Sequence, residues 1–294
     1  MKEFYEKLKS LENNVRIDNY GLYTGKMGLC ISYYLSGYHF QNVSLKTKGE
    51  KLLSEIAENI SLVESFDFDS GILGIGWAIE WLSQNKLIEI DTHDFLSELD
   101  DELYKLVLYQ NAAFIGLGNG TIGRALYLYR RTEASVYNNF YRDLCNRECL
   151  VLLLDEIYEK LLSNPLGLLH DRNNDFSEND YKIFSEVLIF LIELLPSKFN
   201  ISSVKKIIGK LIDVRNINAK MSKQSIQGED QIFFYHIIDT FISAGYHPHI
   251  FFESVEPKQK IVHSCSRNVF ADLLNDIPVG NMKVSWKEAW PSYY

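Results

Sequence analysis

The sequence predicts an all-α fold in which helical hairpins close into an α/α toroid, and three observations support this prediction. A glycine-rich motif recurs in residues 21–28, 71–76 and 116–123, with starts about 50 and about 45 residues apart. An apolar run follows each copy, and amphipathic segments separate the copies. An interval of this length holds two helices and their turns. Each repeat is therefore predicted to be a helical hairpin.

The apolar run after each motif is predicted to be an inner helix of the toroid. Residues 29–35 and 77–82 are too continuously apolar for a surface helix and suit one that is buried on most sides. Where such helices converge, their first turns crowd one another, and glycine permits close approach and a positive φ in the preceding turn. We therefore expect Gly25, Gly74 and Gly120 at one rim of a central cavity.

The remaining helices are predicted where apolar residues recur at three- and four-residue spacing with charged residues between them. Asp94 is expected to cap the helix that follows it, and Asn200 or Ser202 is expected to cap a later one. The glycine copies are clearest in residues 20–170 and residues 171–294 diverge, but the whole chain is predicted to be one domain. The helical segments are Phe4–Leu11, Lys46–Ile60, Phe95–Leu108, Val136–Leu162, Tyr181–Leu195 and Ser202–Leu211.

Composition narrows the class of partner. The chain has 39 acidic and 30 basic residues and a net charge of −9, which argues against a nucleic-acid-binding surface, because such surfaces are basic. This charge favours a positively charged partner or keeps the chain in solution. Residues 1–12 lack the apolar core of a signal peptide, and no uncharged apolar run reaches the length of a membrane span. We therefore expect a cytoplasmic protein without a membrane partner.

Two of the glycine copies, with their flanks, resemble repeats of a known family. Residues 67–82, from Asp-Phe-Asp-Ser-Gly to Glu-Trp-Leu, are similar to the second repeat of the lanthionine synthetase C-like family. Residues 116–131 resemble its third repeat, with a tyrosine-rich helix that ends in Arg130 and Arg131. The resemblance runs from about Tyr20 to His170. It implies a zinc-dependent α/α toroid in which a cysteine thiolate of a precursor peptide adds to a dehydrated residue and forms a thioether ring.

The zinc ligands that the resemblance implies are largely missing from this sequence. In the family, two Cys and one His hold the metal and leave a fourth position open for the substrate thiolate. His263 is the one ligand position retained, so we expect either no cofactor or zinc in an altered site. His236, His247 and His249 offer another metal site with His263, although an exposed loop explains them more simply. The chain has four cysteines, of which one follows residue 149: Cys30, Cys145, Cys149 and Cys265.

Other site positions can be compared with the family one at a time. His170 matches the His that the resemblance implicates in proton transfer, but Asp171 replaces the Gly that follows it there. The acid that the family carries four residues before the third-repeat Gly falls at Ala112 and is missing. Glu80 and Arg124 lie on apolar helices, which rarely carry a charge without a partner. We expect both at the cavity rim, paired across the cavity or reaching solvent.

Three functions stay open at this point. The first is a zinc-less, non-catalytic member of the family that binds a peptide or a maturation enzyme in ribosomal peptide modification. The second is an active thioether-forming cyclase with a displaced metal site and His170 as a catalytic residue. The third is a carbohydrate-active α/α toroid, which needs paired carboxylates on opposite sides of a sugar. Glu64, Asp67 and Asp69 lie too close together in the sequence for that arrangement.

Overall fold

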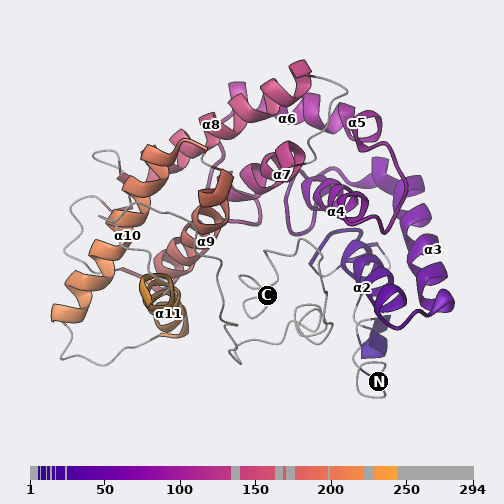
Figure 1. The fold of residues 1–294 in the computed structure, drawn as a ribbon, viewed down its shortest axis with the longest axis horizontal. Coiled ribbons are helices and arrows are strands. Elements are labelled where there is room, and N and C mark those ends of the chain that lie inside the picture. The colour runs from indigo at the N-terminus through magenta and orange to yellow at the C-terminus, as the bar shows by residue number, and fades with distance from the viewer. Residues whose placement is uncertain are drawn as a thin grey trace.

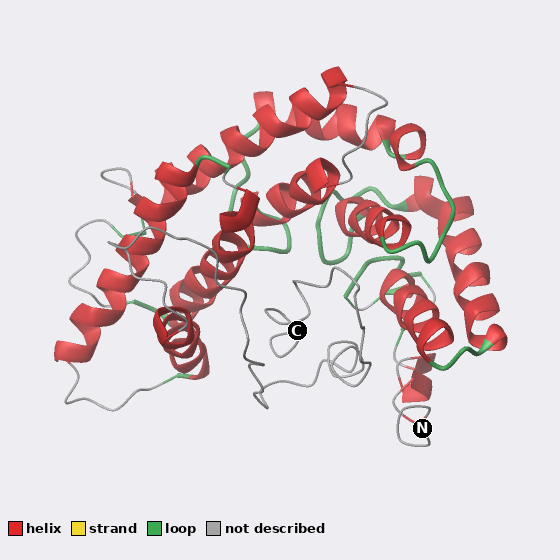
Figure 2. Ribbon diagram, viewed as in Figure 1, coloured by secondary structure: helices red, strands yellow, loops and turns green. Residues whose placement is uncertain are grey.

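The structure is a computed structural model. It describes residues 6–133, 140–162, 168–169, 176–197, 199–221 and 228–243, apart from Lys7, Leu11, Asn14, Ile17 and Thr24. Within these residues the regular elements are helices (Figure 2), which confirms the predicted all-α fold.

The glycine motifs precede the first three helices of an inner layer, which follows a curved arc (Figure 1). Neighbours along this layer pack on one another in chain order, from α2 through α4, α7 and α9 to α11. The helix α4 is buried from Leu73 to Leu82 without interruption, as its apolar sequence predicts. The inner helices are α2 (Lys26–His39), α4 (Ile72–Gln84), α7 (Thr121–Glu133), α9 (Glu178–Leu194) and α11 (Glu229–Ser243).

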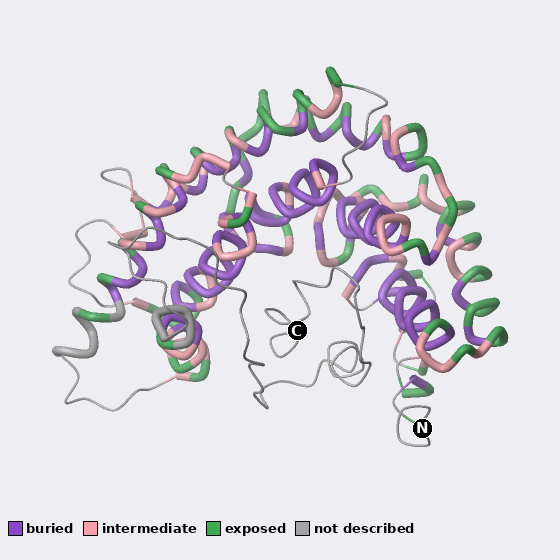
Figure 3. The backbone as a smooth tube through the Cα atoms, in the orientation of Figure 1, coloured by how far each residue is buried: buried purple, intermediate pink, exposed green. Residues whose placement is uncertain are grey.

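The amphipathic segments form an outer layer that covers the inner one. The contacts of α3 with α2, of α8 with α7 and of α10 with α9 join the two layers. Figure 3 shows that the outer helices bury one face against the inner layer and expose the other, as their spacing predicts. The outer helices are α3 (Val43–Asn59), α5 (Thr92–Phe95), α6 (Ser97–Tyr109), α8 (Phe140–Leu162) and α10 (Ile201–Met221).

The alternation of inner and outer helices agrees with a fold built from helical hairpins. Short 3-10 turns, Ile60–Leu62 and Leu195–Ser197, follow α3 and α9. The described helices trace an arc from α2 to α11 (Figure 1). Closure of this arc into a toroid stays a prediction, as does a single domain over the whole chain, because residues 244–294 lie outside the described part.

One predicted cap is wrong. Asp94 lies inside the short helix α5, and Asp91 caps that helix by accepting hydrogen bonds from the amides of His93 at 3.0 Å and Asp94 at 3.4 Å. The chain makes this extra turn before α6 begins at Ser97. Asn200 directly precedes α10, in the predicted place, but α10 continues beyond the predicted Leu211 to Met221.

Candidate functional site

The loops that lead into the first three glycine-preceded helices share one backbone pattern. In each loop, the amide that follows the last glycine before the helix donates to the carbonyl six residues before that glycine. The three bonds are Lys26 to Asn19 at 2.8 Å, Ile72 to Ser65 at 2.9 Å and Thr121 to Phe114 at 3.0 Å. They make Gly25, Gly71 and Gly120 equivalent, 46 and 49 residues apart. Counting from the first glycine of each motif aligns Gly71 with Gly21 and Gly116 instead, and that register is wrong.

Close approach, rather than left-handed backbone, explains the glycines. The capping residues Gly25 and Gly71 have φ of −114° and −112°, which any residue adopts, so the expected positive φ is wrong at these positions. A Cβ on Gly123 would lie 2.7 Å from the Cβ of Phe68, and one on Gly74 would collide with the Phe68 carbonyl oxygen. Gly74 and Gly123 occupy equivalent positions, three residues after their caps. The first turns of α4 and α7 are therefore crowded, as predicted, but by the loops that lead into the helices rather than by one another.

The three glycine loops are joined to one another by backbone hydrogen bonds. Loop 1 is residues 19–25, loop 2 is residues 65–71 and loop 3 is residues 114–120. The amides of Leu22 and Tyr23 in loop 1 donate to the Asp69 carbonyl in loop 2, at 2.9 and 3.0 Å. The amide of Phe68 in loop 2 donates to the Gly118 carbonyl in loop 3, at 2.6 Å. The starts of α2, α4 and α7 therefore lie at one end of the inner layer. That Gly25, Gly74 and Gly120 line the rim of a central cavity there stays a prediction.

A buried acid on α9 meets this end of the layer. The Glu186 carboxylate accepts a hydrogen bond from the Leu117 amide of loop 3 at 2.8 Å, and Glu186 is 4% exposed. Burial raises the pKa of Tyr23 in loop 1 well above its ordinary value, and the charges of Glu186 and Asp69 raise it further. Tyr23 is therefore a neutral hydrogen-bonding group at neutral pH, next to two carboxylates.

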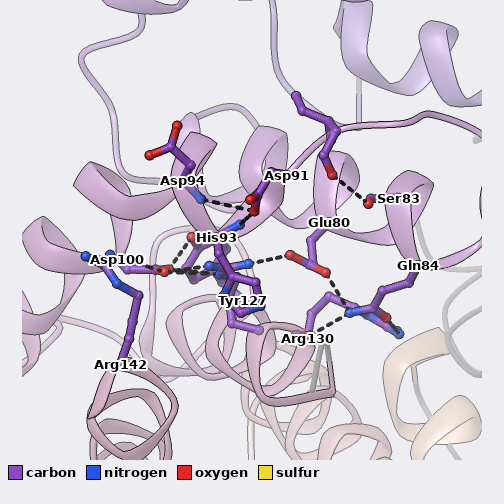
Figure 4. A network of polar contacts seen from close by, with 12 residues as sticks. Glu80, Ser83, Gln84, Asp91, His93, Asp94, Asp100, Tyr127, Arg130 and Arg142 are labelled. Carbon is purple, nitrogen blue, oxygen red and sulfur yellow. Dashed lines mark hydrogen bonds and ion pairs between the residues drawn. The ribbon is translucent and has the colours of Figure 1, made fainter. Parts of the chain in front are cut away.

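A buried ion network joins the two layers farther along the inner helices (Figure 4). Arg131 of α7 donates to both carboxylate oxygens of Asp100 on α6, the shortest contact being 2.7 Å, and it also donates to Glu80 on α4. The Tyr127 hydroxyl donates to Asp100 at 2.6 Å. Burial alone lowers the pKa of Arg131, but the hydrogen bonds and charge of Asp100, with the charges of Tyr127 and Glu80, outweigh it and raise this pKa.

Two further cations extend the network to neighbouring helices. Arg130 donates to the Gln84 side-chain oxygen at 3.2 Å, lies over the Trp77 ring, and faces the Glu193 carboxylate of α9 at 3.9 Å. Arg142, in the first turn of α8, donates to the Ser97 carbonyl at 2.7 Å. Of the two arginines that end the third-repeat helix, Arg130 thus joins the inner helices α4, α7 and α9, whereas Arg131 joins the inner layer to the outer helix α6.

Glu80 does not occupy the rim position predicted for it, whereas the rim position of Arg124 stays a prediction. Glu80 is buried between α4 and α7, where it pairs with Arg131 and accepts from Gln84 at 2.9 Å, so it does not lie at a rim. Arg124 donates to the Gln110 carbonyl at the end of the outer helix α6, at 2.8 Å. Glu80 and Arg124 therefore have different partners and do not pair with each other.

The described cysteines lie in or on the helix layers. Cys30 of α2 faces α3 and donates to the Gly49 carbonyl at 3.4 Å, and Cys149 is buried in α8, whereas Cys145 is exposed. Burial raises the pKa of Cys30, and it raises that of Cys149 to about 11. These two thiols are therefore protonated at neutral pH.

The remaining predicted metal and catalytic residues fall outside the described residues. His170, Asp171, His247, His249, His263 and Cys265 are all in this group. His236 lies within α11, partly exposed. In the part of the chain that the structure describes, His, Cys, Asp and Glu do not gather in threes as metal ligands would. In that same part, none of the helices is long and apolar enough to cross a bilayer.

Sequence reasoning missed Glu186 and Asp100, and it placed the missing family acid one turn too early. With Gly120 as the third-repeat glycine, the position four residues before it is Gly116 rather than Ala112, and it still carries no acid. A signal for Glu186 was present in the sequence, since it is a charged residue beside the apolar run 187–192. The same signal drew attention to Glu80. Asp100 gave no such signal, because other charged residues of α6 surround it in the sequence.

The comparisons with known proteins agree with the family resemblance. A family model described as "Lanthionine synthetase C-like protein" matches residues 1–150, half of the chain. Searches of curated proteins and of solved structures gave no match. The matched half contains loops 1 to 3 and most of the ion network.

Proposed function

The chain belongs to the lanthionine synthetase C-like family, and from this premise we propose that it is a zinc-less member that binds a peptide without closing thioether rings. In this proposal the protein takes part in ribosomal peptide modification by holding a precursor peptide, or the enzyme that carries one.

The position of the cysteines carries this proposal. The family's zinc site requires two cysteines, and Cys265 is the one cysteine after residue 149. A second ligand would have to come from Cys30, Cys145 or Cys149. Cys30 donates to the Gly49 carbonyl of α3, and Cys149 is buried in the outer helix α8. Cys145 is exposed, but it lies on the same outer helix, away from the inner layer. The described residues therefore do not fit the family's ligand set, and we derive no step through zinc.

The chemistry of the substrate thiol points the same way. Addition of a cysteine to a dehydrated residue requires the thiolate, which a metal favours by lowering the thiol pKa. Without a metal, a peptide cysteine has a pKa of about 8.5 and is mostly protonated at neutral pH. Binding is then the simpler use of an inner layer whose loops and ion network are retained. The net charge of −9 favours a basic peptide.

A cyclisation assay with a binding arm tests the proposal. The probe is a synthetic peptide with a basic leader, one dehydroalanine and one cysteine, and thiol loss is followed by alkylation and mass spectrometry. We expect the same rate with the full-length protein as without protein. Fluorescence anisotropy of the labelled peptide is expected to show saturable binding, weaker for a peptide whose leader is acidic.

Two outcomes would contradict the proposal. Cyclisation clearly above the control would establish the active-cyclase alternative and make His170 and His263 catalytic candidates. Absence of both cyclisation and saturable binding would remove the peptide-binding role. Repeating the assay with added zinc separates a chain that lost its metal in purification from one that does not use it.

A further inference from the structure

The bonds between loops follow a rule that changes at the third loop. In each loop, the amide three residues before the capping glycine donates to the next repeat; these amides belong to Leu22, Phe68 and Leu117. For loops 1 and 2 the acceptor is a main-chain carbonyl, two residues before the next capping glycine. For loop 3 the acceptor is a side chain, the carboxylate of Glu186, at 2.8 Å.

The reason lies in how the fourth inner helix begins. The helix α9 starts at Glu178, with a capping box formed by Ser177 and Asp180, so serine caps it where the three earlier inner helices have glycine. Glu186 follows eight residues later, and about 12 Å of helix precedes it at 1.5 Å per residue. At the level of loop 3, α9 is already regular helix whose carbonyls bond within it. A side chain is the acceptor that this helix can offer.

The surroundings of Glu186 fit this role. A Cβ on Gly116 would lie 3.2 Å from Glu186 Oε2, so the absence of a side chain there gives the carboxylate room. Tyr23 of loop 1 is close enough for its pKa to be raised by the charges of both Glu186 and Asp69. The aligned position in loop 2 holds Asp67, whereas loops 1 and 3 have Gly21 and Gly116.

We propose that Glu186 is a positioning residue that takes the place of a fourth glycine loop. Its carboxylate holds loop 3 on α9 by accepting from the Leu117 amide. Loops 1 and 2 are held in turn, because each donates to the loop after it. This role does not depend on whether the protein binds a peptide.

Amide hydrogen exchange of the full-length protein tests the proposal, with Glu186→Met and Glu186→Gln compared. Methionine has a similar length but offers no oxygen, whereas glutamine keeps a carbonyl acceptor. We expect Glu186→Met to speed exchange of the Leu117 amide at least about tenfold, the loss expected for a hydrogen bond to a charged group. Exchange at Phe68 should rise less, and exchange at Ile79 inside α4 should stay unchanged. Glu186→Gln should restore most of the protection.

Ser185→Ala is the matched control, since Ser185 is also buried on α9 but its hydroxyl bonds within the helix, to the Tyr181 carbonyl at 2.9 Å. This variant should leave Leu117 unchanged. The proposal is overturned if Glu186→Met leaves the Leu117 amide protected, if it speeds exchange equally at Ile79, or if Gln behaves like Met. If the Met variant does not fold, Glu186→Asp replaces it, because a side chain one methylene shorter should also release the Leu117 amide.

Discussion

Arg131 holds two buried carboxylates, so its removal leaves two negative charges without their shared cation. Breaking a buried ion pair by removing one partner costs about 3–5 kcal/mol of unfolding free energy. We predict a loss of this size for Arg131→Met, measured by urea denaturation. The control Arg147→Met breaks the exposed pair with Asp143 and should cost less than about 1 kcal/mol. Equal losses in the two variants would show that the network does not stabilise the fold in this way.

Replacing the two carboxylates by neutral side chains refines this test. The triple variant Arg131→Met, Glu80→Gln, Asp100→Asn replaces the cation and both of its carboxylate partners by neutral side chains. Because neither carboxylate is then buried as an unpaired charge, part of the lost stability should return. If the triple variant is less stable than Arg131→Met alone, charge burial is not the source of the loss.

The zinc content of the protein is likewise decided by a few residues, the cysteines and histidines that would bind the metal. We predict that the purified full-length chain carries well below one zinc per molecule, because the family's site needs two cysteines and the sequence has one after residue 149. Elemental analysis checks this value. About one zinc per chain, lost in His263→Ala or Cys265→Ala, would establish the displaced metal site instead.

At the scale of the elements, some helix glycines lie against a neighbour that leaves no room for a side chain, and others do not. A Cβ on Gly123 of α7 would meet Phe68 and the Leu117 carbonyl, whereas one on Gly209 of α10 would meet nothing within 4 Å. Gly123→Ala should therefore destabilise the protein by about 1–3 kcal/mol. Gly209→Ala should stabilise it by about 0.5–1 kcal/mol, because alanine favours a helix interior. Thermal unfolding of both variants measures the difference, and a shared sign would contradict it.

The same loops show what could be predicted from the sequence. The apolar runs and the glycines identified the inner helices, because burial and crowding leave a local signal. The register was wrong because loop 2 carries Asp67 where loops 1 and 3 carry Gly21 and Gly116, so counting from the first glycine shifted the alignment. The role of Glu186 was not predictable, because it depends on a contact with Leu117, 69 residues away. The acidic surroundings of Asp100 in the sequence likewise hide which carboxylate turns inward.

At the scale of the whole molecule, buried tyrosines make stability depend on alkaline pH. Burial raises the pKa of four of them above the ordinary value of 10: Tyr23, Tyr34, Tyr127 and Tyr129. Well below pH 10 these phenols are neutral in both states and contribute no pH dependence. As pH rises above 10, the unfolded chain loses these protons while the folded chain keeps them, so stability falls. Each phenol adds up to about 1.4 kcal/mol per pH unit to this slope.

Urea denaturation between pH 8 and 11 measures this slope. Tyr127→Phe removes one of the titrating phenols, so the fall of stability with pH should be smaller by up to about 1.4 kcal/mol per pH unit. The variant starts from lower stability because Asp100 loses a hydrogen bond. An unchanged slope in this variant would show that Tyr127 ionises in the folded state as it does in the unfolded one.

The direction of the bonds between loops has a consequence for synthesis on the ribosome. In each bond between repeats, the amide donor comes earlier in the chain than its acceptor: Leu22 donates to Asp69, Phe68 to Gly118, and Leu117 to Glu186. Each hairpin therefore emerges before its acceptor exists. At about 5–20 residues per second, the first loop waits roughly 2–10 s for its partner. The third waits longest, since its acceptor is made 69 residues later. Loops 1 and 2 can therefore bond before α9 is made, whereas loop 3 stays without its acceptor until Glu186 has been synthesised.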